Sequence, residues 1–122
     1  MKIGILATTG TAAAGIYADR LTSAGLSPLT LSTRMQENTV MTGIRAVKAG
    51  HDVLGSTLLG EAADTLLARG AERIILACTE IPPALARANR LGPLYVDATQ
   101  ALAENCVAWS QGVASDAAVI AA

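Results

Sequence analysis

The segment Arg73–Cys78 (RIILAC) contains the clearest signal for regular structure in the chain. After Arg73 its residues are all apolar and include two β-branched side chains, which is typical of a strand covered on both faces of a parallel sheet. Ile3–Ala7 is a second run of this kind, and it passes through a Thr/Gly turn into an Ala-rich segment that ends near Gly25. The first segment therefore predicts a buried strand, and the second predicts a strand that leads into a helix.

Two shorter strands and several further helices complete the predicted pattern. The strands are Pro28–Ser32 and Leu94–Asp97. The predicted helices run from Met35 to a stop at Gly50, from Val53 to Leu67 before Gly70, from Pro82 and Pro83 onward, and from Thr99 to about Val113. This alternation predicts an α/β fold with a doubly wound, mainly parallel, four-stranded sheet and helices on both faces.

Length and composition indicate one domain with an aliphatic core. We take residues 1–122 as a single lobe, since this length suits one compact domain and is too short for two. Hydrophobic residues make up 52% of the chain but aromatic residues only 2%, so Ala, Leu, Ile and Val must form the core. We place Cys106 in this core because it lies at helical spacing from Leu102 and Trp109. One helical face is also predicted to be buried, formed by Leu54, Leu58, Ala62 and Leu66.

Charge, hydropathy and cysteine content exclude several classes of partner and site. The net charge is −1, from 9 basic and 10 acidic residues, so no basic face is available for nucleic acid. No stretch approaches the roughly 18 apolar residues of a membrane span, and Thr8–Thr11 interrupts the apolar start too early for a secretory signal. Cys78 and Cys106 form no CxxC pair and His51 is the only histidine, so we expect no zinc site and a reducing cytoplasm.

Polar clusters follow three of the predicted strands. They are Thr8–Thr11, Cys78–Glu80 and Asp97–Thr99. Open parallel sheets bind ligands outside the carboxyl ends of their strands, so the three clusters converge on one crevice if their strands are neighbours. The glycines of the first cluster lack the GxGxxG spacing and no GK[ST] loop occurs, so a nucleotide is not the expected ligand.

Cys78 is the candidate acid/base group of this crevice. Backbone N–H groups at a strand-to-helix turn can lower a thiol pKa from about 8.5 toward neutrality. The neighbouring Glu80 opposes this effect if it is ionised, although it can also orient the thiol or take its proton. The alternative, of equal weight from the local sequence, is that Cys78 is a small buried core residue.

The other polar residues have structural explanations beside the functional ones. Thr9 and Thr11 can hold a carboxylate at a helix N-terminus, but helix capping explains each of them well. Lys48 precedes the stop at Gly50, where a cation stabilises the end of a helix, and it can also pair with a substrate carboxylate. Asp97 is predicted to be an N-cap, and His51 is explained as a polar residue that opens a helix.

Four motifs in order resemble the C-terminal lobe of the aspartate/glutamate racemase family. Cys78-Thr79-Glu80-Ile81-Pro82 resembles the second cysteine motif of that family. The other three motifs are Leu6–Thr11 with Gly15-Ile16-Tyr17, the stretch from Gln36-Glu37 to Val47-Lys48-Ala49-Gly50, and Val96–Thr99. The resemblance spans nearly the whole chain and implies a flavodoxin-like racemase lobe.

The resemblance also implies a function. Members of the family invert the α-carbon of an amino acid without a cofactor, by means of one thiolate and one thiol on opposite faces of the substrate. By this resemblance Cys78 is the C-terminal-lobe thiol, with Glu80 beside it, and Lys48 assists it or binds a carboxylate. Thr8, Thr9, Thr11 and Thr79 contribute to the substrate cradle. The implied substrate is an amino acid with an acidic side chain.

The opposing lobe of the family, with its own cysteine motif, has no counterpart in this sequence. The chain is therefore a piece of a longer protein, acts with a partner such as a second copy of itself, or has lost the activity. Three alternatives to an amino-acid racemase are a hydantoin racemase, a maleate isomerase and a decarboxylase. A further alternative is a carboxylate-binding or interaction lobe without catalysis.

Overall fold

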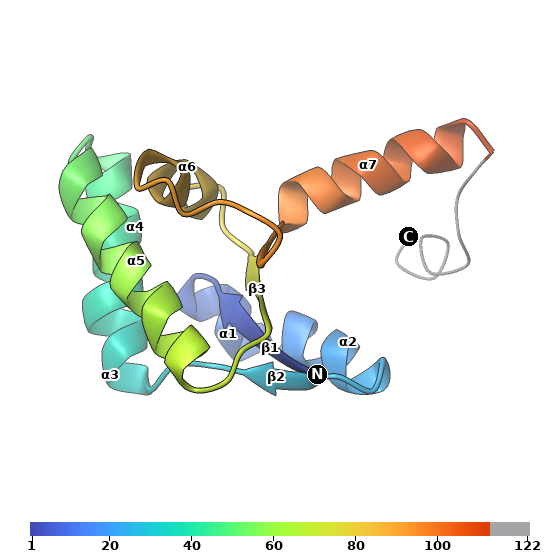
Figure 1. The fold of residues 1–122 in the computed structure, drawn as a ribbon, viewed down its shortest axis with the longest axis horizontal. Coiled ribbons are helices and arrows are strands. Elements are labelled where there is room, and N and C mark those ends of the chain that lie inside the picture. Colours follow the sequence, from blue (N-terminus) through green and yellow to red (C-terminus); the bar gives the residue numbers. More distant parts are fainter. Residues whose placement is uncertain (113–122) are drawn as a thin grey trace.

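The computed structural model, described for residues 1–112, is built on one parallel sheet (Figure 1). Its strands are β1 (Lys2–Leu6), β2 (Ser27–Leu29), β3 (Arg73–Leu76) and β4 (Tyr95–Asp97). Their order in the sheet is β2-β1-β3-β4, and all three pairings are parallel. The predicted four-stranded parallel sheet is therefore confirmed; β2, β3 and β4 are shorter than predicted, and β1 is shifted by one residue.

The helices follow the predicted order with two differences in detail. They are α1 (Thr9–Ala14), α2 (Ile16–Ser23), α3 (Thr33–Met35), the π-helix η1 (Gln36–Met41), α4 (Thr42–Lys48), α5 (Asp52–Ala68), α6 (Ile81–Arg87) and α7 (Ala98–Ser110). The Ala-rich segment forms two helices that meet at Gly15, and the predicted helix from Met35 to Gly50 contains a π-helical stretch. Among residues 1–112, no helix is both long and apolar enough to cross a membrane.

The two faces of the sheet carry different helices. A Cβ atom at Gly4 would lie 3.1 Å from Leu66 Cδ1, so α5 packs closely on one face of β1. Ile5 points to the other face, where it lines a cavity together with residues of α1 and α2. Helices therefore lie on both faces, as predicted for a doubly wound sheet. The strand order reverses between β1 and β3, the position at which open parallel sheets bind ligands.

The main core lies between the sheet and the helices α4, α5 and α6. Its buried residues are aliphatic or alanine: Leu6, Val40, Ile44, Leu59, Ala62, Ala63, Leu66, Ala71, Ile74, Leu76, Ile81, Ala84 and Leu85. The predicted buried face of α5 is correct for Ala62 and Leu66 but wrong for Leu54, which is 50% exposed. The helix turns Gly55 and Leu59 inward instead, because its first turns pack on α4 rather than on the sheet.

Two glycines allow α4 and α5 to pack closely. A Cβ atom at Gly55 would lie 2.5 Å from Val47 Cγ2 and 3.1 Å from the carbonyl oxygen of Gly43. A Cβ atom at Gly43 would lie 2.9 Å from Leu59 Cγ. On the next side of α5, the buried hydroxyl of Ser56 donates a hydrogen bond of 2.8 Å to the carbonyl oxygen of Ala84 in α6. These contacts fix α5 between its two neighbouring helices.

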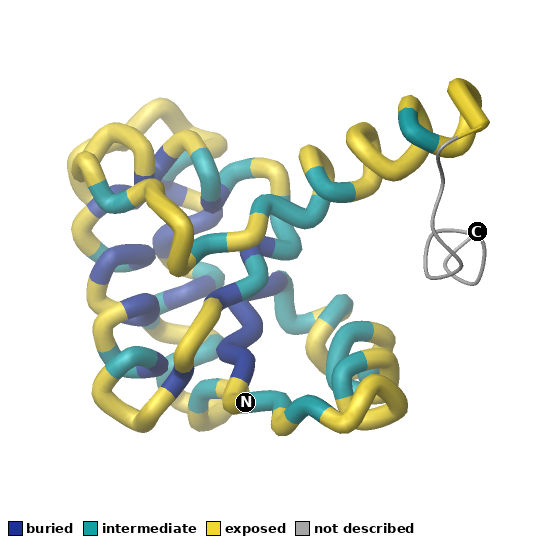
Figure 2. Tube along the Cα trace, turned by 45° about the vertical axis from the view of Figure 1, so that its right-hand side comes forward, coloured by how far each residue is buried: buried dark blue, intermediate teal, exposed yellow. Residues whose placement is uncertain are grey.

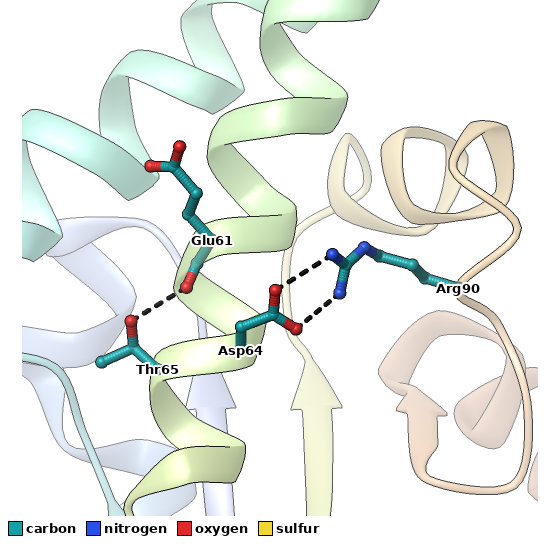
Figure 3. Close-up of polar contacts among 4 residues, drawn as sticks. All are labelled: Glu61, Asp64, Thr65 and Arg90. Carbon is teal, nitrogen blue, oxygen red and sulfur yellow. Dashed lines mark hydrogen bonds and ion pairs between the residues drawn. The ribbon is translucent and has the colours of Figure 1, made fainter.

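Arg90 attaches the segment between α6 and β4 to α5 (Figure 3). Its guanidinium donates to both carboxylate oxygens of Asp64, at 2.6 and 3.0 Å. The hydrogen bond from Arg90 is the main cause that lowers the pKa of Asp64. Because the pair is two-pronged, it fixes orientation better than a single contact between exposed charges does.

Helix α7 projects away from the rest of the described residues (Figures 1 and 2). It contacts β4, but none of its residues is buried. Leu102 is 65% and Trp109 64% exposed, and Cys106 is exposed as well. The prediction that Cys106 belongs to the core is therefore wrong. Helical spacing correctly identifies an apolar stripe on α7, but it does not specify which surface covers that stripe.

We predict that Gly55→Ala destabilises the protein by about 1–2 kcal/mol, because the added methyl group overlaps the stiff side chain of Val47 and the backbone of Gly43. Gly10→Ala is the matched control, since a Cβ atom there meets nothing within 4 Å. Its free energy of unfolding is expected to stay unchanged or rise by up to about 1 kcal/mol. The free energy of unfolding of each variant is measured by urea denaturation, monitored by circular dichroism. Equal stability of the two variants would contradict close α4–α5 packing.

Candidate active site

Cys78 lies where the chain leaves the sheet after β3. Leu6 pairs with Leu76 across the parallel strands, and the N–H of Ala77 still donates a hydrogen bond of 2.8 Å to the carbonyl oxygen of Leu6. The carbonyl oxygen of Cys78 accepts a hydrogen bond of 3.1 Å from the N–H of Ile81, which starts α6. The side chain of Cys78 is half-buried and packs against the main core on one side. The thiol therefore occupies the edge of the sheet, between core and surface.

Glu80 accepts hydrogen bonds from the side chains of Cys78 and Thr79. Cys78 Sγ and Thr79 Oγ1 each donate a hydrogen bond of 3.0 Å to the same oxygen, Oε2 of Glu80. Burial is the largest cause that raises the pKa of the Cys78 thiol, and its hydrogen bond to Glu80 raises the pKa further. The same hydrogen bond lowers the pKa of Glu80. In the resting protein the proton therefore resides on sulfur and the carboxylate is ionised.

Lys48 is the last residue of α4, and its charge acts on the thiol and the carboxylate together. It lowers the pKa of Cys78 and the pKa of Glu80, although in each case other groups contribute more. The side chain of Lys48 is exposed. The structure therefore joins Cys78, Thr79 and Glu80 by hydrogen bonds, and the charge of Lys48 acts on two of them.

The threonines after β1 form two kinds of hydrogen bond. One kind caps helix α1, and the other joins the turn to η1. Thr8 is the N-cap of α1, where its Oγ1 accepts from the N–H of Thr11 at 3.3 Å and donates to Thr11 Oγ1 at 3.1 Å. Thr9 does not cap the helix. Its hydroxyl donates a hydrogen bond of 2.6 Å to Oε1 of Glu37 in η1. Capping thus explains Thr8, whereas Thr9 faces a carboxylate.

Gln36 and Glu37 contact the threonine turn, although neither was predicted from the sequence as a site residue. Gln36 Nε2 donates a hydrogen bond of 2.8 Å to the carbonyl oxygen of Ala7 and lies 3.5 Å from Thr9 Oγ1. Both residues open the π-helical stretch, a conformation that occurs frequently at functional sites. The sequence offers one signal for their role, which is that two adjacent polar residues open a helix after the second strand. That signal does not reveal that they contact Ala7 and Thr9.

Two cavities are open near the carboxyl ends of the strands. The larger, of about 350 Å³, lies along β4 and α7 and includes Asp97 in its lining. The smaller, of about 220 Å³, is lined by Ile5, Thr9, Thr11, Ala12, Ala13, Gly15, Tyr17, Ala18, Thr30, Leu31, Thr33, Gln36 and Glu37. Thr9 and Thr11 therefore border a cavity. Cys78, Thr79 and Glu80 line neither of these two cavities.

Asp97 and His51 have the structural positions that the sequence indicated. Asp97 is the N-cap of α7, and its Oδ1 accepts from the N–H groups of Thr99 and Gln100 at 3.0 and 3.3 Å. His51 occupies the N-cap position of α5, although its side chain forms no capping hydrogen bond. Within residues 1–112, no three His, Cys, Asp or Glu side chains gather closely enough to hold a metal ion.

Comparison with known proteins agrees with this arrangement. The model of the Asp/Glu/hydantoin racemase family matches residues 1–106. An uncharacterized protein encoded in the pnlA 3′ region of Pectobacterium carotovorum subsp. carotovorum is 42% identical over 110 residues, which are 88% of this chain and 72% of that protein. Cys78, Glu80 and the threonine turn lie within the residues that the family model matches. The chain therefore belongs to the Asp/Glu/hydantoin racemase family.

Proposed function

We propose that this chain is the Cys78-bearing lobe of a cofactor-independent amino-acid racemase. The observation that carries the proposal is the hydrogen bond between Cys78 Sγ and Glu80 at the edge of the sheet, within reach of the charge of Lys48. A thiol in this position can exchange a proton with a substrate bound outside the carboxyl ends of β1 and β3. Membership of the racemase family makes α-proton transfer the reaction class to test first.

The reaction requires two groups that handle protons on opposite faces of the substrate. A thiolate takes the α-proton, and the electron pair of the broken C–H bond moves into the substrate carboxylate. A thiol on the other face then gives its proton to the α-carbon and becomes a thiolate, so protons and charge balance. The raised thiol pKa keeps Cys78 protonated at rest, so Cys78 starts as the donor and ends as the base for the reverse reaction. The thiol on the opposite face must first release its proton to solvent before it can act as the base.

Lys48 and the threonine turn supply the charge stabilisation that the carbanion needs. Negative charge accumulates on the substrate carboxylate when the α-proton leaves, and a fixed cation or N–H group near that carboxylate lowers the barrier. Lys48 provides the cation beside Cys78. The hydroxyl of Thr11 provides a neutral donor, since the hydroxyls of Thr8 and Thr9 already donate to Thr11 and to Glu37. We therefore propose an amino acid with an acidic side chain as the substrate.

A second lobe must supply the opposing thiol, and we propose a second copy of this chain. Helix α7 exposes Leu102 and Trp109, and Val96 of the adjacent strand β4 is 40% exposed. Burying this apolar surface between two copies would stabilise the pair and bring two copies of Cys78 to one cleft. A free thiol is needed on each side, so we propose the reducing cytoplasm as the compartment.

We predict that this protein exchanges the α-proton of aspartate for deuterium in deuterated buffer, and that Cys78→Ser lowers the rate at least about 100-fold. A serine hydroxyl is a much weaker acid than a thiol, so it is a poor proton donor and is not deprotonated to act as the base. Proton NMR follows the loss of the α-hydrogen signal. Cys106→Ala is the matched control, since it removes the exposed thiol of α7 but keeps the stripe of Leu102 and Trp109 apolar, and it should keep the parental rate. Equal exchange by the Cys78→Ser variant and the parent would remove this thiol from the mechanism.

The same samples distinguish catalysis from simple binding. A carboxylate-binding lobe without activity would show a higher melting temperature with aspartate but no exchange in any variant. Parallel assays with a hydantoin and with maleate test the related reactions, since the same thiol would act on a different carbon acid or double bond. Activity on one of these compounds alone would reassign the substrate and keep Cys78 as the reactive group.

We predict that Glu80→Gln lowers the pKa of Cys78 and that Lys48→Met raises it. The carboxylate raises the thiol pKa through its hydrogen bond and its charge, whereas the lysine charge lowers that pKa. Only the thiolate reacts with iodoacetamide, so the rate of alkylation rises with pH through the thiol pKa. Measured in a Cys106→Ser background, the midpoint should move to lower pH in the first variant and to higher pH in the second. Coincident curves would contradict the electrostatic coupling of these three groups.

We predict that the protein is a dimer in light-scattering measurements and that joint replacement of Leu102 and Trp109 by Asp yields single chains. Two charges on α7 would be costly to bury in an apolar interface. Val53→Asp is the matched control, because Val53 is 69% exposed on α5, away from α7. A parental protein that stays a single chain at all concentrations would contradict pairing through α7.

A further inference from the structure

We propose that Glu37 is the group that recognises the protonated amine of the substrate, at the cavity of about 220 Å³ beside the threonine turn. This inference rests on the proposed function, because it assigns one end of the amino acid that Cys78 is proposed to act on. It adds a residue that determines substrate specificity, and this residue lies on η1, outside the sequence motif that contains Cys78.

The position of Glu37 is set by a short hydrogen bond. Thr9 Oγ1 donates to Oε1 of Glu37 at 2.6 Å, and both residues line the cavity. A carboxylate retains further acceptor positions after it accepts one hydrogen bond. An amine bound in the cavity can therefore reach the same carboxylate without displacing Thr9.

The charges around the cavity favour a cation at this end. Glu37 is the only charged residue of the cavity lining, and the rest of the lining consists of hydroxyl, amide and apolar side chains. In the part of the chain that the structure describes, no Lys or Arg forms an ion pair with Glu37. Lys48, in contrast, places its positive charge at Cys78. This separation of charges orients an amino acid with its amine toward Glu37 and its carboxylate toward Lys48.

The backbone around Glu37 holds this orientation in place. Gln36, the preceding residue, donates to the carbonyl oxygen of Ala7, so two successive side chains of η1 contact the turn after β1. The N–H of Thr9 also contacts Met41 Sδ at 3.4 Å, at the other end of η1. A carboxylate that is oriented before the ligand arrives loses little conformational freedom on binding. The π-helical stretch thus has a definite role, which is to present Glu37 to the turn.

The experiment compares aspartate with succinate, which has the same two carboxylates and no amine. Isothermal titration of the full chain should show that the parent binds aspartate more tightly than succinate. Glu37→Gln keeps an acceptor for Thr9 but removes the charge, so it should weaken aspartate binding about fivefold, as for a pair that stays partly open to water. Its affinity for succinate should stay the same or increase. Glu61→Gln is the control, since Glu61 is an exposed carboxylate on α5, away from the cavity, and it should leave both affinities unchanged.

Two results would overturn the inference. One is a parent without preference for aspartate over succinate, including failure to bind either compound. The other is a Glu37→Gln variant that keeps the parental ratio of the two affinities. The Cys78→Ser variant separates this inference from the proposed function, because it should lose exchange and retain the preference for aspartate. If the preference depends on Glu37 but no sample catalyses exchange, the amine subsite stands and the racemase proposal falls.

Discussion

The close packing of α5 on β1 and β3 is the contact on which the rest of the structure depends. Gly4 has no side chain, so the buried Leu66 of α5 lies directly against the strand. Gly43 and Gly55 let α4 and α5 approach closely, and the hydroxyl of Ser56 binds α5 to α6. This explains how a chain with almost no aromatic residues builds a dense core: short side chains bring backbones together where large ones would fill gaps. The two central strands are thereby held in register, and their carboxyl ends stay side by side.

The candidate site is a consequence of that register. Because Leu6 pairs with Leu76, the threonine turn after β1 and the cysteine turn after β3 leave the sheet at the same edge. Each turn is then tied to a carboxylate, Thr9 to Glu37 and Cys78 to Glu80. The two carboxylates have different surroundings. Burial and the hydrogen bond to Glu80 raise the pKa of the Cys78 thiol, whereas Glu37 lies at a cavity without a positive charge in its lining.

Helix α7 shows the opposite situation, in which local structure forms without a covering surface. Asp97 caps its first turn, so the helix starts where its sequence indicates. Its apolar stripe nevertheless stays exposed, and the larger cavity opens between α7 and β4. The same region is proposed to meet the second lobe that a two-thiol reaction requires. On this proposal, one second lobe would both cover the apolar stripe and supply the opposing acid/base group.

The sequence by itself determined the elements of this protein and their order. Continuous apolar runs are sufficient to specify buried parallel strands, and caps and glycines mark where helices begin and end, because both signals act over a few residues. It also indicated Cys78, Thr79, Glu80 and Lys48, because each belongs to a motif of residues that are consecutive or nearly so in the sequence. Tertiary structure alone decided that Glu37 meets Thr9, that Leu54 faces solvent and that Cys106 is outside the core. These features depend on which surfaces meet, and a residue's local neighbours carry no information about a partner 28 positions away.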